Sequence, residues 1–158
     1  MSEPEQQPLP TPAEARALAA VLDALVPPSD DGRRPGAGAL GLGDRIAEAM
    51  RKSPDLGAAV GRGLASLGAL ARERGASGFE ALPASEREVL LRELVAREPG
   101  FLPGLLFHTY AGYYQHPQVL EGIGLEPRPP FPKGYAMEAS DLDALLAPVR
   151  RREPLYRS

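Results

Sequence analysis

The pattern of apolar residues along the chain predicts helices throughout. Apolar residues return every three or four positions in successive segments, without the alternation typical of β-strands. The first segment follows Thr11-Pro12-Ala13-Glu14, which combines an N-cap, a proline in the first helical turn and a capping-box glutamate. Pro27-Pro28 ends it. We therefore expect an all-α fold, a compact bundle of about five helices.

The second and third helices are expected to follow each other closely. The stretch from Ser29 to Gly41 is too rich in Gly, Pro and charge for regular structure, and residues 42–50 then carry apolar side chains at helical spacing. Ser53-Pro54-Asp55 opens the third helix, whose glycines each cost about 1 kcal/mol relative to alanine. We expect these small residues to let a neighbouring helix approach closely. They are Gly57, Gly61, Gly63 and Gly68.

The fourth and fifth helices are separated by Pro99-Gly100. Ser85-Glu86-Arg87-Glu88 has the form of a capping box at the start of the fourth helix. The fifth helix begins near Phe101 and ends before Pro117, because a proline disfavours the helical conformation of the residue that precedes it. The helical domain is thus expected to cover residues 11–116.

The remaining residues differ in composition from the helical domain. Prolines and glycines between 117 and 139 are spaced too closely for helix or strand, which predicts an extended arm. Ser140-Asp141-Leu142-Asp143 predicts the start of a short helix, and Pro148 is expected to end it. Residues 117–158 would form the arm, this helix and a basic tail, packed on the domain or on its partner. The polar residues 1–10 are expected to be a mobile tail.

Composition and charge exclude several classes of function. With 158 residues and a net charge of −3, the chain lacks the concentrated excess of Lys and Arg that nucleic-acid binding needs. The absence of cysteine excludes disulfides, zinc-thiolate sites and thiol catalysis. No apolar stretch approaches the roughly 20 residues that span a bilayer. The N-terminal residues are acidic where a secretory signal is basic, so we expect a cytoplasmic protein.

The densest cluster of reactive side chains is the run from His108 to His116. A stand-alone enzyme would use His108 with Tyr113 or Tyr114, since a helix brings an imidazole and phenols toward one face. The alternative is that these are core or interface residues whose polar tips find hydrogen-bond partners. A regulatory helical module that binds a small molecule is a third hypothesis. The two histidines lie roughly 12 Å apart along a helix, too far to share a metal ion.

Several segments occur in a characteristic order along the chain. They are Leu25-Val26-Pro27-Pro28 at the end of the first helix, Phe79 to Leu82, the run His108 to Tyr114 followed by His116-Pro117, and Pro129-Pro130-Phe131-Pro132. This order resembles the gluconate 2-dehydrogenase subunit 3 family. The resemblance extends from about Thr11 to Tyr156, and the aromatic run is its most specific part.

The resemblance implies a non-catalytic small subunit of a flavin-dependent oxidoreductase of the glucose-methanol-choline type. Such a subunit binds and stabilises a large catalytic subunit, which holds FAD and oxidises a sugar, a glycoside or another alcohol. The chain itself is expected to hold neither a cofactor nor a metal. Bulky aromatic and arginine side chains commonly carry interface energy. The residues expected to bind the partner are His108, Tyr113, Tyr114, His116, Phe131, Tyr135, Arg150, Arg151, Arg152 and Tyr156.

Overall fold

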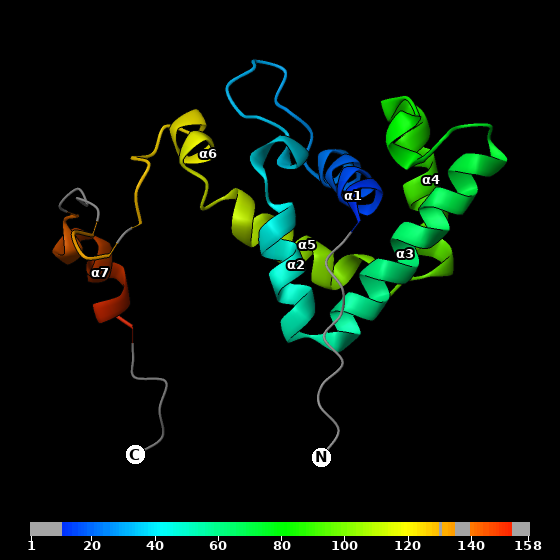
Figure 1. Cartoon of the computed structure of the whole chain (residues 1–158). Helices are drawn as coiled ribbons and strands as arrows, with labels where there is room; N and C mark the ends of the chain where they lie inside the picture. The colour runs from blue at the N-terminus through cyan, green and yellow to red at the C-terminus, as the bar shows by residue number, and fades with distance from the viewer. Residues whose placement is uncertain (1–10, 130, 135–139, 153–158) are drawn as a thin grey trace, which may run out of the picture. The chain divides into compact units, whose positions relative to one another are not determined.

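The structure is a computed structural model that describes residues 11–129, 131–134 and 140–152. Within these residues every regular element is helical (Figure 1), which confirms the predicted all-α class. The chain divides into two compact units, Met1–Arg128 and Pro129–Ser158. The elements are α1 (Pro12–Leu25), the 3-10 helix η1 (Ala37–Leu40), α2 (Gly43–Lys52), α3 (Pro54–Glu73), the 3-10 helix η2 (Phe79–Ala81), α4 (Ala84–Arg97), α5 (Leu102–Tyr113), α6 (Pro117–Gly122) and α7 (Leu142–Arg150).

Helix α1 lies at the centre of the first unit, where it packs against α2, α3, α4 and both 3-10 helices (Figure 1). The predicted capping box is present: the Thr11 hydroxyl accepts a hydrogen bond from the Glu14 amide, and the Glu14 carboxylate accepts one from the Thr11 amide. One face of the helix is buried through Leu18, Val21 and Leu22. Burial of such side chains contributes about 1.5–3 kcal/mol each, so packing of this face holds the unit together.

The segment between α1 and α2 is held against α1 by Asp23. Its carboxylate accepts a hydrogen bond from the Gly38 amide at 2.8 Å. A Cβ atom at Gly38 would lie 2.2 Å from the carbonyl oxygen of Ala19, so the approach requires glycine. The expectation of no regular structure in residues 29–41 is wrong at η1. This short helix forms because Asp23 and the backbone at the end of α1 accept its hydrogen bonds. The Ala37 amide donates to the carbonyl of Val26, the C-cap residue of α1, at 2.9 Å.

Helix α3 packs against α2, α4 and α5. The predicted N-cap is present, since the Ser53 hydroxyl accepts a hydrogen bond from the Leu56 amide at 3.4 Å. Its glycines do not share one role. A Cβ atom at Gly63 would lie 2.1 Å from a ring carbon of Phe101, whereas one at Gly61 would meet no atom within 4 Å. The predicted close approach thus occurs at Gly63, and the closest neighbour there is an aromatic ring.

Helix α4 begins differently from the prediction. It starts at Ala84, with Pro83 as the N-cap residue and without a side-chain cap. The predicted capping box at residues 85–88 does not form because the Pro83 carbonyl already accepts the first helical bond, from the Arg87 amide at 2.9 Å. Ser85 therefore lies inside the first turn.

Helix α5 lies against α2 and α3. One of its faces is buried, and the Thr109 hydroxyl in this face donates a hydrogen bond to the Leu105 carbonyl at 2.7 Å. The Thr109 side chain is polar and fully buried, and this bond provides its hydroxyl with a partner inside the same helix. The buried residues of α5 are Leu105, Thr109, Gly112 and Tyr113.

Helix α6 corrects the expectation that the chain is extended from residue 117. Pro117 occupies the first helical turn, where the missing N–H removes no helical bond. Val119 is fully buried in the core of the first unit. A Cβ atom at Gly122 would lie 2.6 Å from the Arg33 carbonyl oxygen, so α6 packs directly on the loop before η1. The first unit accordingly continues to Arg128, beyond the boundary at residue 116.

In the second unit, the structure describes residues 129, 131–134 and 140–152. The Asp141 carboxylate accepts a hydrogen bond from the Ala144 amide at 3.0 Å, which confirms the predicted start of α7. The predicted end is wrong, since the helix continues through Pro148 to Arg150. An ion pair of 2.9 Å joins Arg150 in the last turn to Asp143 in the first turn.

The described part of the chain contains no helix that is both long and apolar enough to cross a bilayer.

Candidate functional site

Three aromatic side chains lie exposed along α5 and its C-cap. Phe107, Tyr110 and Tyr114 expose 68%, 44% and 49% of their surface. Their spacing of three and four residues places them on one face of the helix, opposite the buried face. The rings of Tyr110 and Tyr114 stack with their centroids 6.2 Å apart. We call these three residues the aromatic stripe.

Tyr113 points into the first unit instead. Only 2% of its surface is exposed, and its hydroxyl donates a hydrogen bond to the Pro35 carbonyl at 3.0 Å. Burial raises the pKa of the Tyr113 phenol. Tyr113 therefore ties α5 to the loop before η1, and it presents almost no surface to a partner.

Replacement of this tyrosine tests that role. Tyr113→Phe should lower the free energy of unfolding by about 1 kcal/mol at pH 7, because the Pro35 carbonyl loses its donor. The raised pKa means that the neutral phenol is favoured in the folded protein. The contribution of the neutral phenol to the free energy of unfolding is complete below the pKa of about 10 that tyrosine has in the unfolded chain. It is lost as the pH rises through the raised pKa of the folded protein. The stability difference between wild type and variant should therefore shrink above that pH in urea titrations.

Tyr110→Phe is the matched control, because the Tyr110 side chain is exposed. Its change should stay within about 0.5 kcal/mol. Equal stabilities of Tyr113→Phe and wild type at pH 7 would contradict a stabilising role for the hydrogen bond from Tyr113 to Pro35.

His108 is half-buried beside the aromatic stripe. Its ring meets the ring of Phe107 edge-on, with centroids 5.2 Å apart. Within the described residues, no hydrogen bond joins His108 to Tyr113 or Tyr114. His108 instead lines an open cleft of about 540 Å³. The other residues of the cleft are Arg45, Glu48, Ala49, Lys52 and Ser53.

The charged groups of this cleft come from α2. The ammonium group of Lys52 lies 2.7 Å from the Glu48 carboxylate, and this hydrogen bond lowers the pKa of Glu48. Arg45 donates to the amide oxygen of Gln115 at 3.4 Å. The cleft thus offers two basic side chains and one carboxylate next to the aromatic stripe.

His116 is the N-cap residue of α6. Its carbonyl accepts hydrogen bonds from the Val119 and Leu120 amides, both at 3.0 Å. The Nδ1 atom is buried and has no hydrogen-bond partner among the described residues. In the part of the chain that the structure describes, no three His, Cys, Asp or Glu side chains gather as metal ligands would.

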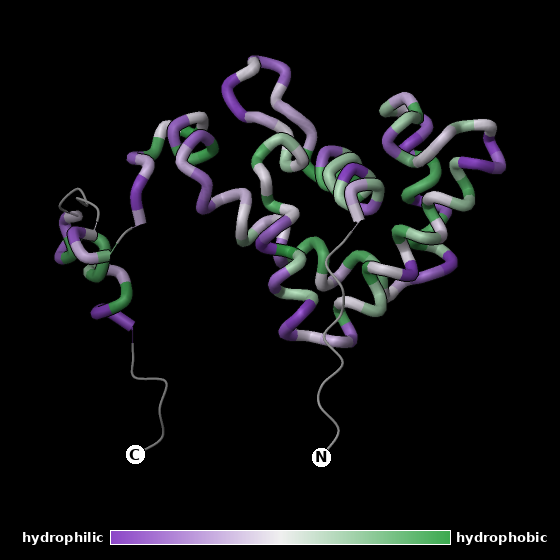
Figure 2. Tube along the Cα trace, in the orientation of Figure 1, coloured by the Kyte–Doolittle hydropathy of each residue, from purple (hydrophilic) through white to green (hydrophobic). Residues whose placement is uncertain are grey.

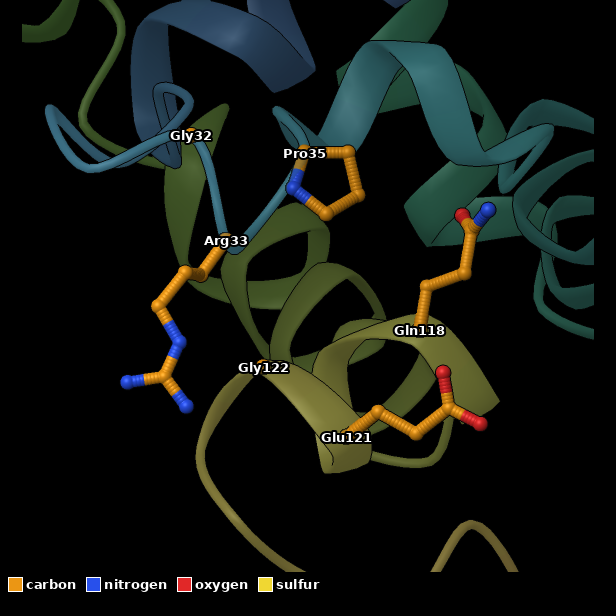
Figure 3. Close-up of a pocket in the computed structure, with 6 residues that line it drawn as sticks. All are labelled: Gly32, Arg33, Pro35, Gln118, Glu121 and Gly122. Carbon is orange, nitrogen blue, oxygen red and sulfur yellow. The ribbon is translucent and has the colours of Figure 1, made fainter.

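An open cavity of about 450 Å³ lies between α6 and the loop before η1 (Figure 3). The guanidinium group of Arg33 points to one side of it, whereas the side chains of Gln118 and Glu121 point to the other (Figure 3). A ligand site needs polar groups that converge. These three side chains diverge and do not form such a site.

The other predicted partner-binding residues belong to the second unit. Phe131 exposes 84% of its surface. Arg150 is paired with Asp143, and Arg151 donates to the Ala147 carbonyl at 3.2 Å. Arg152 is exposed as well. Tyr135 and Tyr156, like the predicted tail at residues 1–10, lie outside the described residues.

Sequence reasoning missed Phe107 and Tyr110 as candidate contact residues. It grouped Tyr113 with Tyr114 because they are neighbours in the sequence, although adjacent residues of a helix point about 100° apart. The spacing of Phe107, Tyr110 and Tyr114 was the signal that would have identified the exposed face.

The first unit is thus a small helical body that displays a fixed aromatic stripe on one helix. Residues 12–126 match the family model described as Gluconate 2-dehydrogenase subunit 3. The chain therefore belongs to the gluconate 2-dehydrogenase subunit 3 family, which confirms the resemblance in the sequence. No curated protein and no solved structure matches the chain. The family match ends at residue 126 and the first compact unit at residue 128.

Proposed function

We propose that the chain is a non-catalytic small subunit that binds and stabilises the FAD-dependent catalytic subunit of a sugar or alcohol oxidoreductase. Membership of the subunit 3 family supports a place in a complex of the gluconate 2-dehydrogenase type. On this proposal FAD belongs to the large subunit and the complex is cytoplasmic. The chain contributes contact surface, and the chemistry takes place in its partner.

The observation that carries the proposal is the aromatic stripe. Aromatic side chains bury about 150–250 Å² each and are enriched among the residues that dominate binding energy. The opposite face of α5 is buried, and Tyr113 fixes the helix to the Pro35 carbonyl. Because the backbone beneath the stripe is already ordered, binding loses little conformational entropy.

The cleft beside the stripe supports a negatively charged border on the partner surface. Arg45 donates to a neutral amide, whereas a carboxylate would form a stronger, charge-assisted bond with the same guanidinium group. The partner surface that fits is an apolar pocket for the stripe, bordered by acidic side chains that face Arg45 and Lys52. Such rim charges contribute more to association rate and orientation than to affinity.

Purification from the native host tests this function. A tagged chain should retain a larger protein that shows the visible absorbance of flavin and oxidises sugars or alcohols. Removal of the chain should lower the melting temperature of that flavoprotein, since a partner that binds only the folded state stabilises it by about 2.7 kcal/mol at 100 times its dissociation constant. A chain that retains no flavoprotein, or that oxidises these substrates alone, would overturn the proposal.

A further inference from the structure

The loop at residues 29–36 is closed by hydrogen bonds of its own. The Ser29 amide donates to the Arg34 carbonyl at 3.0 Å, and the Ser29 hydroxyl accepts a hydrogen bond from the Arg34 amide at 2.9 Å. Residues 30–33 at the tip are exposed, and Figure 2 shows this tip as hydrophilic. None of the residues 29–35 belongs to the hydrophobic core. The position of the loop therefore depends on the segments that it contacts.

Helix α6 is joined to the core of the first unit by one apolar side chain. Val119 is fully buried, whereas the other residues of the helix are exposed or half-buried. Among the described helices of the first unit, none packs extensively against α6. The C-terminal end is closed by the Leu125 amide, which donates to the Leu120 carbonyl at 2.8 Å. A helix of six residues is not stable in water without tertiary contacts, so α6 also depends on its neighbours.

The loop and α6 contact each other directly. A Cβ atom at Gly122 would lie 2.6 Å from the carbonyl oxygen of Arg33 and 2.8 Å from the Cγ atom of Arg34. The open cavity of about 450 Å³ lies between the same two segments (Figure 3). The Tyr113 hydroxyl joins the loop to the end of α5 through the Pro35 carbonyl. Each segment is thus held by the other and by the end of α5.

We propose that residues 29–36 and 117–125 open and close together, as one cooperative segment pair, while α1 to α5 stay folded. We call these residues the α6–loop pair. Proteins open locally in such cooperative units, and a unit with few buried apolar contacts opens most easily. The inference does not depend on what binds to the aromatic stripe.

Opening of the α6–loop pair would change the end of the aromatic stripe. The hydrogen bond from Tyr113 to Pro35 joins α5 to the loop, so it breaks when the loop moves away. The ring of Tyr114 lies edge-on against the Tyr113 ring, with centroids 5.2 Å apart, and Tyr114 begins the short link from α5 to α6. The closed pair therefore fixes the position of Tyr114, and the open pair releases it.

Hydrogen exchange of the full-length chain, followed by NMR, tests the proposal. The amides of Ser29 and Arg34 report on the loop, and those of Ile123 and Leu125 report on α6, because all four donate hydrogen bonds within their own segment. In the wild type, the four amides should show similar protection factors. These factors should be lower than those of the buried parts of α1 and α3.

Substitutions at the contacts of the α6–loop pair should act on both segments. Gly122→Ala places a methyl group against the Arg33 carbonyl and should accelerate exchange of all four amides by the same factor, about 5- to 100-fold. Tyr113→Phe removes the bond to Pro35 and should accelerate them by about fivefold. Should Gly122→Ala fail to fold, Tyr113→Phe decides the test.

Gly63→Ala is the matched control, because it adds the same methyl group at a tight contact in the core of the first unit. That contact stays closed when the α6–loop pair opens. The variant should accelerate the slowest amides of α1 and α3 and leave the four reporter amides unchanged.

Three outcomes would overturn the inference. They are acceleration of one segment without the other in Gly122→Ala, the same separation in Tyr113→Phe, and equal acceleration of reporter and core amides in Gly63→Ala. The last result would mean that the pair opens only when the whole first unit unfolds. The measurements use the chain without a partner, so none of these results bears on the proposed function.

Discussion

Phe107→Asp is expected to weaken binding of the flavoprotein subunit by about 100-fold or more, the range for loss of a central aromatic contact. Phe107 is the most exposed member of the aromatic stripe, with 68% of its surface in solvent. Docking would bury its ring against an apolar pocket, and a carboxylate in that pocket would lose its hydration without gaining a partner. The same substitution should leave the unfolding free energy of the chain within about 0.5 kcal/mol of wild type.

Val89→Asp is the matched control for this variant. Val89 exposes 53% of its surface on α4, so the substitution also places a charge at an exposed apolar position. It should leave flavoprotein binding unchanged in titrations followed by calorimetry. Loss of affinity in both variants, or in neither, would show that the interface is not centred on the aromatic stripe.

Gly63→Ala is expected to destabilise the first unit by about 1–3 kcal/mol, because it overpacks a filled core. The added methyl group would lie 2.1 Å from the ring of Phe101, which is itself almost fully buried. At this distance the ring of Phe101 or the backbone of α3 must shift. The variant should unfold at a lower urea concentration in circular dichroism.

Gly61→Ala separates this packing effect from helix propensity. Gly61 lies two residues earlier in the same helix, and a Cβ atom there would meet no atom within 4 Å. Alanine at this position should stabilise the chain by about 0.4–1 kcal/mol, since it removes the unfolded-state freedom of glycine. Similar shifts of both variants in the same direction would contradict the packing of Phe101 on Gly63.

The fold was predictable where local chemistry decides it. Thr11 and Ser53 cap helices as expected, and Asp141 caps α7 within the segment expected to start it, because a cap needs only neighbouring residues. The fifth helix ends before Pro117 as expected, but Pro117 then opens α6, since proline is tolerated in the first turn. Pro148 was expected to end its helix and instead lies inside α7.

The candidate site was predictable only in part. The run from His108 to Tyr114 was recognised, but the direction of each side chain depends on which face of α5 the rest of the unit covers. The bond from Tyr113 to Pro35 joins residues 78 positions apart. Contacts at such separation are set by the packing of several helices, and the pattern of one segment does not contain them.

The exposure of Phe107 also bears on how the chain is produced in a cell. An apolar surface that the complex would cover stays open on any copy made in excess, and open apolar surfaces promote self-association. Unmatched copies would then be targets for chaperones and proteases. On the proposed function, balanced synthesis of the two subunits keeps the pool of orphan copies small.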